Sequence, residues 1–438
     1  MERGVLVTVD LGETGGWTAG ERSAELRDLA RTAGVDVISE QVLKRREPVP
    51  ASFLGKGRAE DLNDICTEQD IDIVVFNNDL SPSQQRNLER IVQTKTIDRT
   101  QLILDIFAQR AHSNEGKLQV ELAQLLYNLP RLTGKGIVLS RLGGGIGTRG
   151  PGEQKLEMDR RRIRTRIAKL KNSLEKLSAR RAMMRRHRAR VAGLTIAIVG
   201  YTNVGKSTLL NALTRSHVVT EDKLFATLDP TARKFVLPDG QPVLFVDTVG
   251  FLQELPHHLI EAFKATLEEA TDAELILHLV DLSHPKMQEQ AESVRTTLLE
   301  LGVGTTPVLT VLNKIDLVDA PAERAAAFAD ACLISAKTHR GFSDLIARVQ
   351  AYLESSLVAV RLELGPERSD LISLVHESGV VDSKSYRGEV CVLEARVPER
   401  VRERLGEISR KSEVATSSAS PPSGHLPRSG DVGSRKQA

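Results

Sequence analysis

A glycine-rich loop between an apolar strand and a helix is the feature that most restricts how this chain can fold. The loop GYTNVGKS, residues 200–207, follows the run TIAIV and precedes the helix-like TLLNAL. In this setting, loop N–H groups and a helix N-terminus point at phosphate oxygens. Lys206 then reaches the β- and γ-phosphates, and Ser207 ligates Mg²⁺. The pattern predicts a nucleotide-binding α/β domain, and residues 200–207 are called the phosphate loop below.

Three further motifs follow strand-like runs in the order that such a domain requires. Asp247-Thr-Val-Gly250 ends the run VLFV, so that its carboxylate can hold magnesium through a water and Gly250 can bond the γ-phosphate. The motif from Asn313 to Asp316 ends VLTVL, and the motif from Ser335 to Lys337 ends the next strand-like run. A single tetrapeptide of this kind is common, but the ordered set is rare.

The NKID motif predicts which base is bound. The Asp316 carboxylate can accept from the N1–H and the N2 amino group of guanine, a charge-assisted pair that adenine cannot complete. The stem of Lys314 can cover the base, Asn313 can tie neighbouring loops together, and a backbone N–H of residues 335–337 can meet the guanine O6. The motifs together therefore predict that the chain binds GTP.

With LFATLDPTAR between the first two motifs, the set resembles the translation-factor-related class of P-loop GTPases. Upstream, LSPSQQRNLE, TIDRTQLILDIFAQRAHSNEGKLQVELAQL and GGIGTRGPGEQKLEMDRRRIRTRI resemble the HflX family of ribosome-associated GTPases. The resemblance extends over roughly residues 35–410. It implies a Mg²⁺-dependent GTPase that binds the RNA of the large ribosomal subunit and splits stalled or idle ribosomes.

The motifs and the resemblance together give a set of expected site residues. The resemblance makes Thr227 of FATLD the switch threonine and places residues 225–229 in the nucleotide site. The magnesium ligands are then Ser207 and Thr227. The expected GTP-binding residues are Gly200, Tyr201, Thr202, Asn203, Val204, Gly205, Lys206, Ser207, Phe225, Ala226, Thr227, Leu228, Asp229, Asp247, Thr248, Val249, Gly250, Asn313, Lys314, Ile315, Asp316, Ser335, Ala336 and Lys337.

No residue is assigned to activation of the attacking water. Phe251 stands where small signalling GTPases place a glutamine, and a phenyl ring cannot orient water, so intrinsic hydrolysis should be slow. Docking to a partner or a K⁺ ion can complete such a site. Asn203 is the candidate K⁺ ligand, and the alternative is that it only shapes the loop.

A second glycine-rich stretch, GGGIGTRGPG at residues 143–152, contains the spacing G-x-G-x-x-G. A dinucleotide site is disfavoured because basic residues stand where a ribose-binding acid is needed. A passive hinge stays open as an alternative. We favour a tip that contacts RNA, with Arg141 and Arg149 beside glycines that let the backbone approach a phosphate. Behind it, residues 155–190 carry fifteen Lys or Arg and three acids, which favours RNA affinity over a merely solvated helix face.

The fold class expected is α/β, with a P-loop GTPase domain, an N-terminal α/β domain, a long helical hairpin and a small C-terminal α+β domain. Residues 1–34 are weakly patterned and are interpreted as a lead-in, and a helix ending at Pro130 is expected. Leu156, Ile163, Leu170, Leu177 and Met184 form a heptad seam on the basic helix. The expected segments are the N-terminal domain over 1–112, the hairpin over 113–192, the GTPase domain over 193–355, the C-terminal domain over 356–410 and a disordered tail over 411–438.

Composition bears on location and partners. The three cysteines are far apart and form no CxxC pair, which disfavours a disulfide framework or a zinc site. No apolar run approaches the roughly 18 residues needed to cross a bilayer. We expect a monomeric cytoplasmic protein, and peripheral attachment to a membrane stays open. Two rival functions also stay open: a binding module for which GTP is only an assembly ligand, and ATP use by the N-terminal domain.

Overall fold

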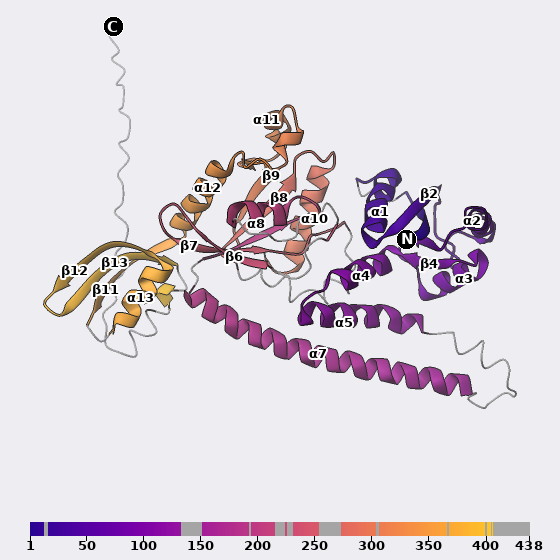
Figure 1. Cartoon of the computed structure of the whole chain (residues 1–438), viewed down its shortest axis with the longest axis horizontal. Helices are drawn as coiled ribbons and strands as arrows, with labels where there is room; N and C mark the ends of the chain where they lie inside the picture. Colours follow the sequence, from indigo (N-terminus) through magenta and orange to yellow (C-terminus); the bar gives the residue numbers. More distant parts are fainter. Residues whose placement is uncertain are drawn as a thin grey trace, which may run out of the picture. The chain divides into compact units, whose positions relative to one another are not determined.

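The chain forms two compact units, Met1–Gln350 and Ala351–Ala438, in a computed structural model (Figure 1). No helix among the residues described is both long and apolar enough to cross a membrane. Only the backbone is described for residues 151–156, 181–191, 369–370 and 377–378. The structure describes residues 1–12, 16–132, 151–191, 194–214, 224–225, 231–253, 273–303, 306–365, 368–398, 401–403 and 405.

The N-terminal part of the first unit is a parallel sheet with strand order β2-β1-β3-β4, flanked by helices. Its strands and helices alternate along the chain, which is typical of α/β domains. The elements are β1 (Glu2–Asp10), α1 (Ala19–Ala33), β2 (Val35–Lys44), α2 (Lys56–Glu68), β3 (Ile73–Phe76), α3 (Pro82–Val92), β4 (Lys95–Asp98) and α4 (Arg99–Arg110).

The interpretation of residues 1–34 as a lead-in is wrong, because β1 is an inner strand of this sheet. Val5, Val7 and Val9 are fully buried in the same apolar cluster as Phe76 of β3. Leu6 is also fully buried, as expected for a parallel strand covered on both faces. Helix α1 begins at a capping box in which Thr18 and Glu21 satisfy each other's backbone N–H groups.

Two helices of the first unit lie side by side and run in opposite directions (Figure 1). They are α5 (Asn114–Arg131) and α7 (Pro151–Val191). Leu170 of the heptad seam is 2% exposed, and Arg166 of α7 makes two contacts of 2.6 and 2.7 Å with Glu121 of α5. The helix α5 ends at Arg131, one residue after the expected Pro130, so the N–H that the proline lacks weakens only its last turn. The expected tip at residues 143–150 lies outside the described residues.

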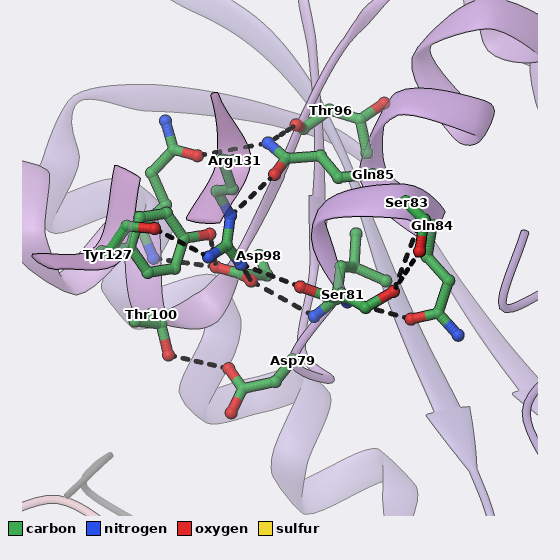
Figure 2. A network of polar contacts seen from close by, with 12 residues as sticks. Asp79, Ser81, Ser83, Gln84, Gln85, Thr96, Asp98, Thr100, Tyr127 and Arg131 are labelled. Atoms are coloured by element: carbon green, nitrogen blue, oxygen red, sulfur yellow. Dashed lines mark hydrogen bonds and ion pairs between the residues drawn. The ribbon is translucent and has the colours of Figure 1, made fainter. Parts of the chain in front are cut away.

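A buried carboxylate, Asp98, fastens α5 to the N-terminal sheet (Figure 2). Its Oδ1 accepts from the hydroxyl of Tyr127 at 2.7 Å and from the N–H of Gln101 at 2.9 Å. Its Oδ2 accepts from Arg131 at 3.1 Å and from the N–H of Leu80 at 3.2 Å. Burial raises the pKa of Asp98, and these donors oppose that rise because they favour the ionised form.

The rest of the first unit is a mixed sheet with strand order β10-β9-β8-β5-β7-β6, in which only the β6–β7 pair is antiparallel. This confirms the expected α/β fold. The sequence pattern does not predict β6, since it is a largely exposed edge strand with polar residues. The elements are β5 (Leu194–Gly200), α8 (Lys206–Thr214), β6 (Thr231–Val236), β7 (Pro242–Asp247), β8 (Leu275–Asp281), α10 (Met287–Glu300), β9 (Val308–Asn313), η1 (Ile315–Leu317), α11 (Pro321–Arg324), η2 (Ala325–Ala327), β10 (Cys332–Leu333) and α12 (Phe342–Ser355).

The second unit contains an antiparallel sheet with strand order β11-β13-β12. Its elements are β11 (Leu357–Leu364), α13 (Ser369–Ser378), β12 (Val380–Arg387) and β13 (Val390–Pro398). The sequence pattern does not predict β12, because it is a polar and mostly exposed edge strand without a buried face to reveal it. The expected tail at 411–438 lies outside the described residues, and the domain limits given above stay predictions.

The Asp98 cluster leads to a prediction about stability. Tyr127→Phe removes one hydrogen bond to a buried carboxylate while it keeps the ring. We expect the free energy of unfolding of the N-terminal domain to fall by about 1.5–3 kcal/mol. Trp17, the chain's single tryptophan, is 8% exposed in this domain, so its fluorescence during chemical denaturation measures the change.

Tyr386→Phe is the matched control, since the Tyr386 side chain is 65% exposed and lies in the second unit. It should leave the Trp17 transition unchanged. Equal transitions for both variants would contradict the importance given to the Asp98 cluster.

Candidate nucleotide-binding site

The four predicted motifs meet at one edge of the second sheet. The phosphate loop follows β5, Asp247–Gly250 ends β7, Asn313 ends β9, and Ser335–Lys337 follows β10. Because these strands are parallel, their carboxyl ends lie at the same edge, where ligands bind in open α/β sheets.

Close contacts fix the shape of the phosphate loop. Gly205 has a φ of +94°, and a Cβ there would lie 2.5 Å from Nδ2 of Asn313, so a side chain is excluded. Asn203 also has a positive φ, +60°, a conformation that asparagine tolerates better than most residues. This backbone angle supports the loop-shaping alternative for Asn203.

Lys206 is folded onto the loop that carries it. Its Nζ donates to the carbonyl oxygens of Tyr201 at 2.9 Å and Gly200 at 3.2 Å, and the residue is 7% exposed. Burial lowers the pKa of Lys206 to about 8, because the charged form loses its hydration. Phosphate oxygens at this position would give the ammonium group stronger acceptors than the carbonyls do.

Two hard oxygen donors lie together where magnesium is predicted. Ser207 Oγ donates to Asp247 Oδ2 at 2.6 Å, and Asp247 is fully buried at the end of β7. A hydroxyl and a carboxylate suit Mg²⁺, which takes oxygen ligands and one or two carboxylates at phosphate sites. The residues present therefore fit this ion. Thr227, the other predicted ligand, lies outside the described residues.

Asn313 joins the phosphate loop to the predicted base-binding loops. Its Nδ2 donates to the carbonyl of Val204 at 2.7 Å, and its Oδ1 accepts from the N–H of Ala336 at 2.9 Å. The side chain is almost completely buried, so both ends of the amide need these partners. The arrangement agrees with the loop-tying role expected of Asn313.

The side chains predicted to read guanine lie beside this junction. Lys314 has a φ of +65°, and its Nζ lies 2.7 Å from Asp281 Oδ2 at the end of β8. Asp316 is exposed in the short helix η1, where its carboxylate is open to a base. The sequence motifs did not identify Asp281. It is a polar residue at the end of an apolar strand, β8, that pairs with the strand before the NKID motif, and this pattern could have indicated it.

Two expected residues, Thr248 and Phe225, and also Phe251 have side chains turned away from this edge. Thr248 is buried and its hydroxyl donates to the carbonyl of Ile198 at 2.8 Å. Phe225 packs its ring against Phe107 of α4, with the centroids 4.6 Å apart. Phe251 is 1% exposed, so its ring belongs to the core. Residues 226–229 lie outside the described residues.

Models of three protein families match this chain. "GTP-binding GTPase N-terminal" matches residues 20–108, "GTP-binding GTPase Middle Region" matches 110–188, and "50S ribosome-binding GTPase" matches 195–314. The chain is 46% identical to GTPase HflX of Lacrimispora saccharolytica, over 91% of this chain and 94% of the relative. It is 40% identical to GTPase HflX of Escherichia coli, over 85% of this chain and 89% of the relative.

Among solved structures, the chain is similar to a GTP-binding protein from Sulfolobus solfataricus in complex with GDP. The identity is 23% and the TM-score is 0.44, with 80% of this chain and 98% of the other covered.

The exposed position of Asp316 leads to a prediction about base choice. Asp316→Asn replaces an acceptor-only carboxylate by an amide that presents donors to guanine. Loss of a hydrogen bond to a charged group costs about 1.5–3 kcal/mol, so GTP affinity should fall by roughly 10- to 150-fold. Xanthosine triphosphate carries a carbonyl in place of the N2 amino group and should recover binding. Titration of both nucleotides measures the difference.

Asp319→Asn removes another exposed carboxylate, three residues further along the chain, and serves as the control. It should leave both affinities unchanged. If Asp316→Asn weakens GTP and xanthosine triphosphate equally, Asp316 does not read the base.

Proposed function

This chain belongs to the HflX family of GTPases and hydrolyses GTP, and on that premise we propose that it uses the nucleotide to control binding to the large ribosomal subunit. The observation that carries the proposal is the exposed basic surface of α7, in the same unit as the nucleotide site. The family description "50S ribosome-binding GTPase", matched by residues 195–314, supports this partner. Separation of stalled or idle ribosomes is the outcome that we propose for the cycle.

The described part of α7 has an apolar side and a basic side. Ile163, Ile167, Leu174 and Leu177 are half-buried, and Leu170 is buried. Basic side chains occupy the exposed positions between them, and ribosomal RNA offers a dense array of phosphates to such a surface. These exposed residues are Arg161, Arg162, Arg164, Arg166, Lys169, Lys171, Lys176 and Arg180.

We propose the following roles for residues of this chain in GTP hydrolysis. Lys206 and the loop N–H groups bind the phosphates, and the N–H of Gly250 meets the γ-phosphate. Ser207 and Thr227 would ligate Mg²⁺, and Asp247 would help to hold the ion. When bound, the ion would supply positive charge that stabilises the negative charge of the phosphates. The buried ring of Phe251 cannot orient the attacking water, so another element completes the site.

Two elements are proposed for this task. Docking on RNA can order the segment around Thr227, or a K⁺ ion held partly by Asn203 can stabilise the developing charge. We favour docking, because the basic side of α7 gives the protein a means to respond to RNA. The rival function is a GTP-liganded ribosome-binding module in which turnover is incidental.

Ribosome affinity should depend steeply on salt if α7 contacts phosphates. Replacing Arg161, Arg162 and Arg164 together by glutamine should flatten the slope of log affinity against log salt by about two to three units. Sedimentation with purified large subunits over a series of salt concentrations measures this slope. A matched triple change on three other helices, Arg31, Arg58 and Arg90 to glutamine, should leave it unchanged. If the original protein and both triple variants give equal slopes, the basic residues of α7 face solvent and do not contact RNA phosphates.

GTP turnover should distinguish the proposed function, in which hydrolysis controls ribosome binding, from the GTP-liganded binding module. If docking completes the site, large subunits should raise GTP turnover by about 100-fold or more in either Na⁺ or K⁺, the size expected of one strong electrostatic stabiliser. If K⁺ completes it, Na⁺ should lower turnover even without ribosomes. Flat, near-zero turnover with subunits would favour the module, and fast turnover of the isolated protein in Na⁺ would contradict an incomplete site.

The backbone of Asn203 provides a control for the ion. Asn203→Gly keeps the positive φ accessible but removes the side-chain ligand, whereas Asn203→Ala loses the ligand and strains the loop. If Asn203 holds K⁺, both variants should lose the K⁺ dependence. If it only shapes the loop, the glycine variant should behave like the original protein.

A further inference from the structure

The side chain of Tyr201, the second residue of the phosphate loop, links three parts of the first unit. Its ring is buried, with 4% of the residue exposed. Its hydroxyl accepts from the N–H of Gln253 at 2.8 Å and donates to the carboxylate of Glu25 in α1. Burial raises the pKa of Tyr201 well above its ordinary value, so the hydroxyl keeps the proton that it donates.

Glu25 is itself held in place by a residue of helix α4. Its Oε2 lies 2.6 Å from Nη2 of Arg99, the first residue of α4, and both side chains are about nine-tenths buried. A charge-assisted pair in such surroundings is strong and has little freedom to rearrange. A carboxylate that accepts from the Tyr201 hydroxyl also makes the hydroxyl oxygen a better acceptor for Gln253.

Gln253 belongs to a short stretch, residues 250–253, that begins three residues after the end of β7. This stretch lies on the phosphate loop and is called the Gly250 segment below. The N–H of Phe251 donates to the carbonyl of Gly200 at 3.1 Å, and the N–H of Thr202 donates to the carbonyl of Phe251 at 2.8 Å. The Tyr201 hydroxyl adds a side-chain hydrogen bond to these two backbone ones. The segment is therefore fastened to the loop at three points.

This fastening leaves little room where a third phosphate is expected. A Cβ on Gly250 would lie 2.8 Å from Cγ2 of Thr202 and 3.1 Å from Nζ of Lys206. A γ-phosphate that contacts both Lys206 and the N–H of Gly250 has to enter between them. The Gly250 segment must then move off the loop, whereas GDP makes no such demand.

We infer that Tyr201 is a positioning residue that sets the preference between GDP and GTP, because its hydroxyl holds the Gly250 segment on the phosphate loop. Glu25 strengthens that hold from the N-terminal domain. The inference rests on the roles proposed for Lys206 and Gly250 at the γ-phosphate. It concerns the nucleotide site alone and does not depend on ribosome binding.

The test is a pair of affinities measured on the full chain without ribosomes. Tyr201→Phe keeps the ring and removes only the hydroxyl. GTP should then bind about 2- to 10-fold more tightly, the worth of one hydrogen bond between neutral groups, while GDP affinity stays within about 2-fold. A non-hydrolysable GTP analogue and GDP, each titrated by calorimetry, give the two values.

Glu25→Gln should shift the ratio in the same direction but by less, since an amide accepts more weakly from the hydroxyl than a carboxylate does. In the Tyr201→Phe background, Glu25→Gln should change the ratio no further. The control is Glu21→Gln, which weakens another contact of α1, the ion pair of Glu21 with Lys286 at 3.5 Å, and leaves the Tyr201 hydroxyl and Glu25 unchanged. It should leave the ratio unchanged.

Three outcomes would overturn the inference. Equal changes in GDP and GTP affinity for Tyr201→Phe would indicate general damage to the site. An effect of Glu21→Gln equal to that of Glu25→Gln would indicate loosened packing of α1. If Glu25→Gln changes the ratio of GTP to GDP affinity further in the Tyr201→Phe background, Glu25 does not act through the hydroxyl. If the unmodified chain fails to bind the nucleotides, the proposed GTP site itself is wrong, which is a distinct result.

Discussion

The buried side chain of Asn313 is the contact on which the geometry of the nucleotide site depends. Parallel strands bring the motif loops to one edge, but they do not fix the loops relative to one another. The amide does so, because one end binds the carbonyl of Val204 and the other binds the N–H of Ala336. A buried amide that lost either partner would be left with an unpaired polar group, at a cost of about 1–3 kcal/mol. The phosphate loop and the predicted base-binding loops are thus held in one arrangement.

Two neighbouring residues at the junction of β4 and α4 connect the other parts of the first unit. Asp98 holds α5 through Tyr127 and Arg131, and α5 packs against the basic helix α7. Arg99 holds Glu25, which reaches Tyr201 in the phosphate loop. Removing one partner of such a buried charged pair is costly, so each cluster has little freedom. The proposed RNA-binding helix and the phosphate loop are therefore both fastened to one short stretch of backbone.

The N-terminal domain also touches the segment that precedes the predicted switch threonine. Leu224 donates its N–H to the hydroxyl of Thr32 at 3.3 Å, and Phe225 packs on Phe107. Phe225 was expected in the nucleotide site, but its ring is 2% exposed and covers the N-terminal domain instead. Together with the contact between Glu25 and Tyr201, this places the N-terminal domain against both the phosphate loop and residues 224–225.

The sequence by itself determined the α/β class, the order of the motifs and the edge of the sheet where they meet. Those features are local, since a glycine loop after an apolar strand can be recognised from the adjacent residues of the chain alone. It also predicted the seam of α7, because a heptad pattern records which face of a helix is buried. The assignment of individual site residues stays a prediction, although the structure brings Ser207 close to Asp247 and Asn313 close to the phosphate loop.

Only the tertiary structure decided which distant residues complete these local patterns. Glu25 lies 176 residues from Tyr201, and nothing in the stretch around Glu25 marks it as a partner of the phosphate loop. The strand β1 was missed because its short apolar run can be recognised as an inner strand only once the strands on either side of it are known. Both β6 and β12 were missed because edge strands keep their polar residues in water. Sequence patterns report what a segment buries, whereas the identity of its neighbours depends on how the chain packs.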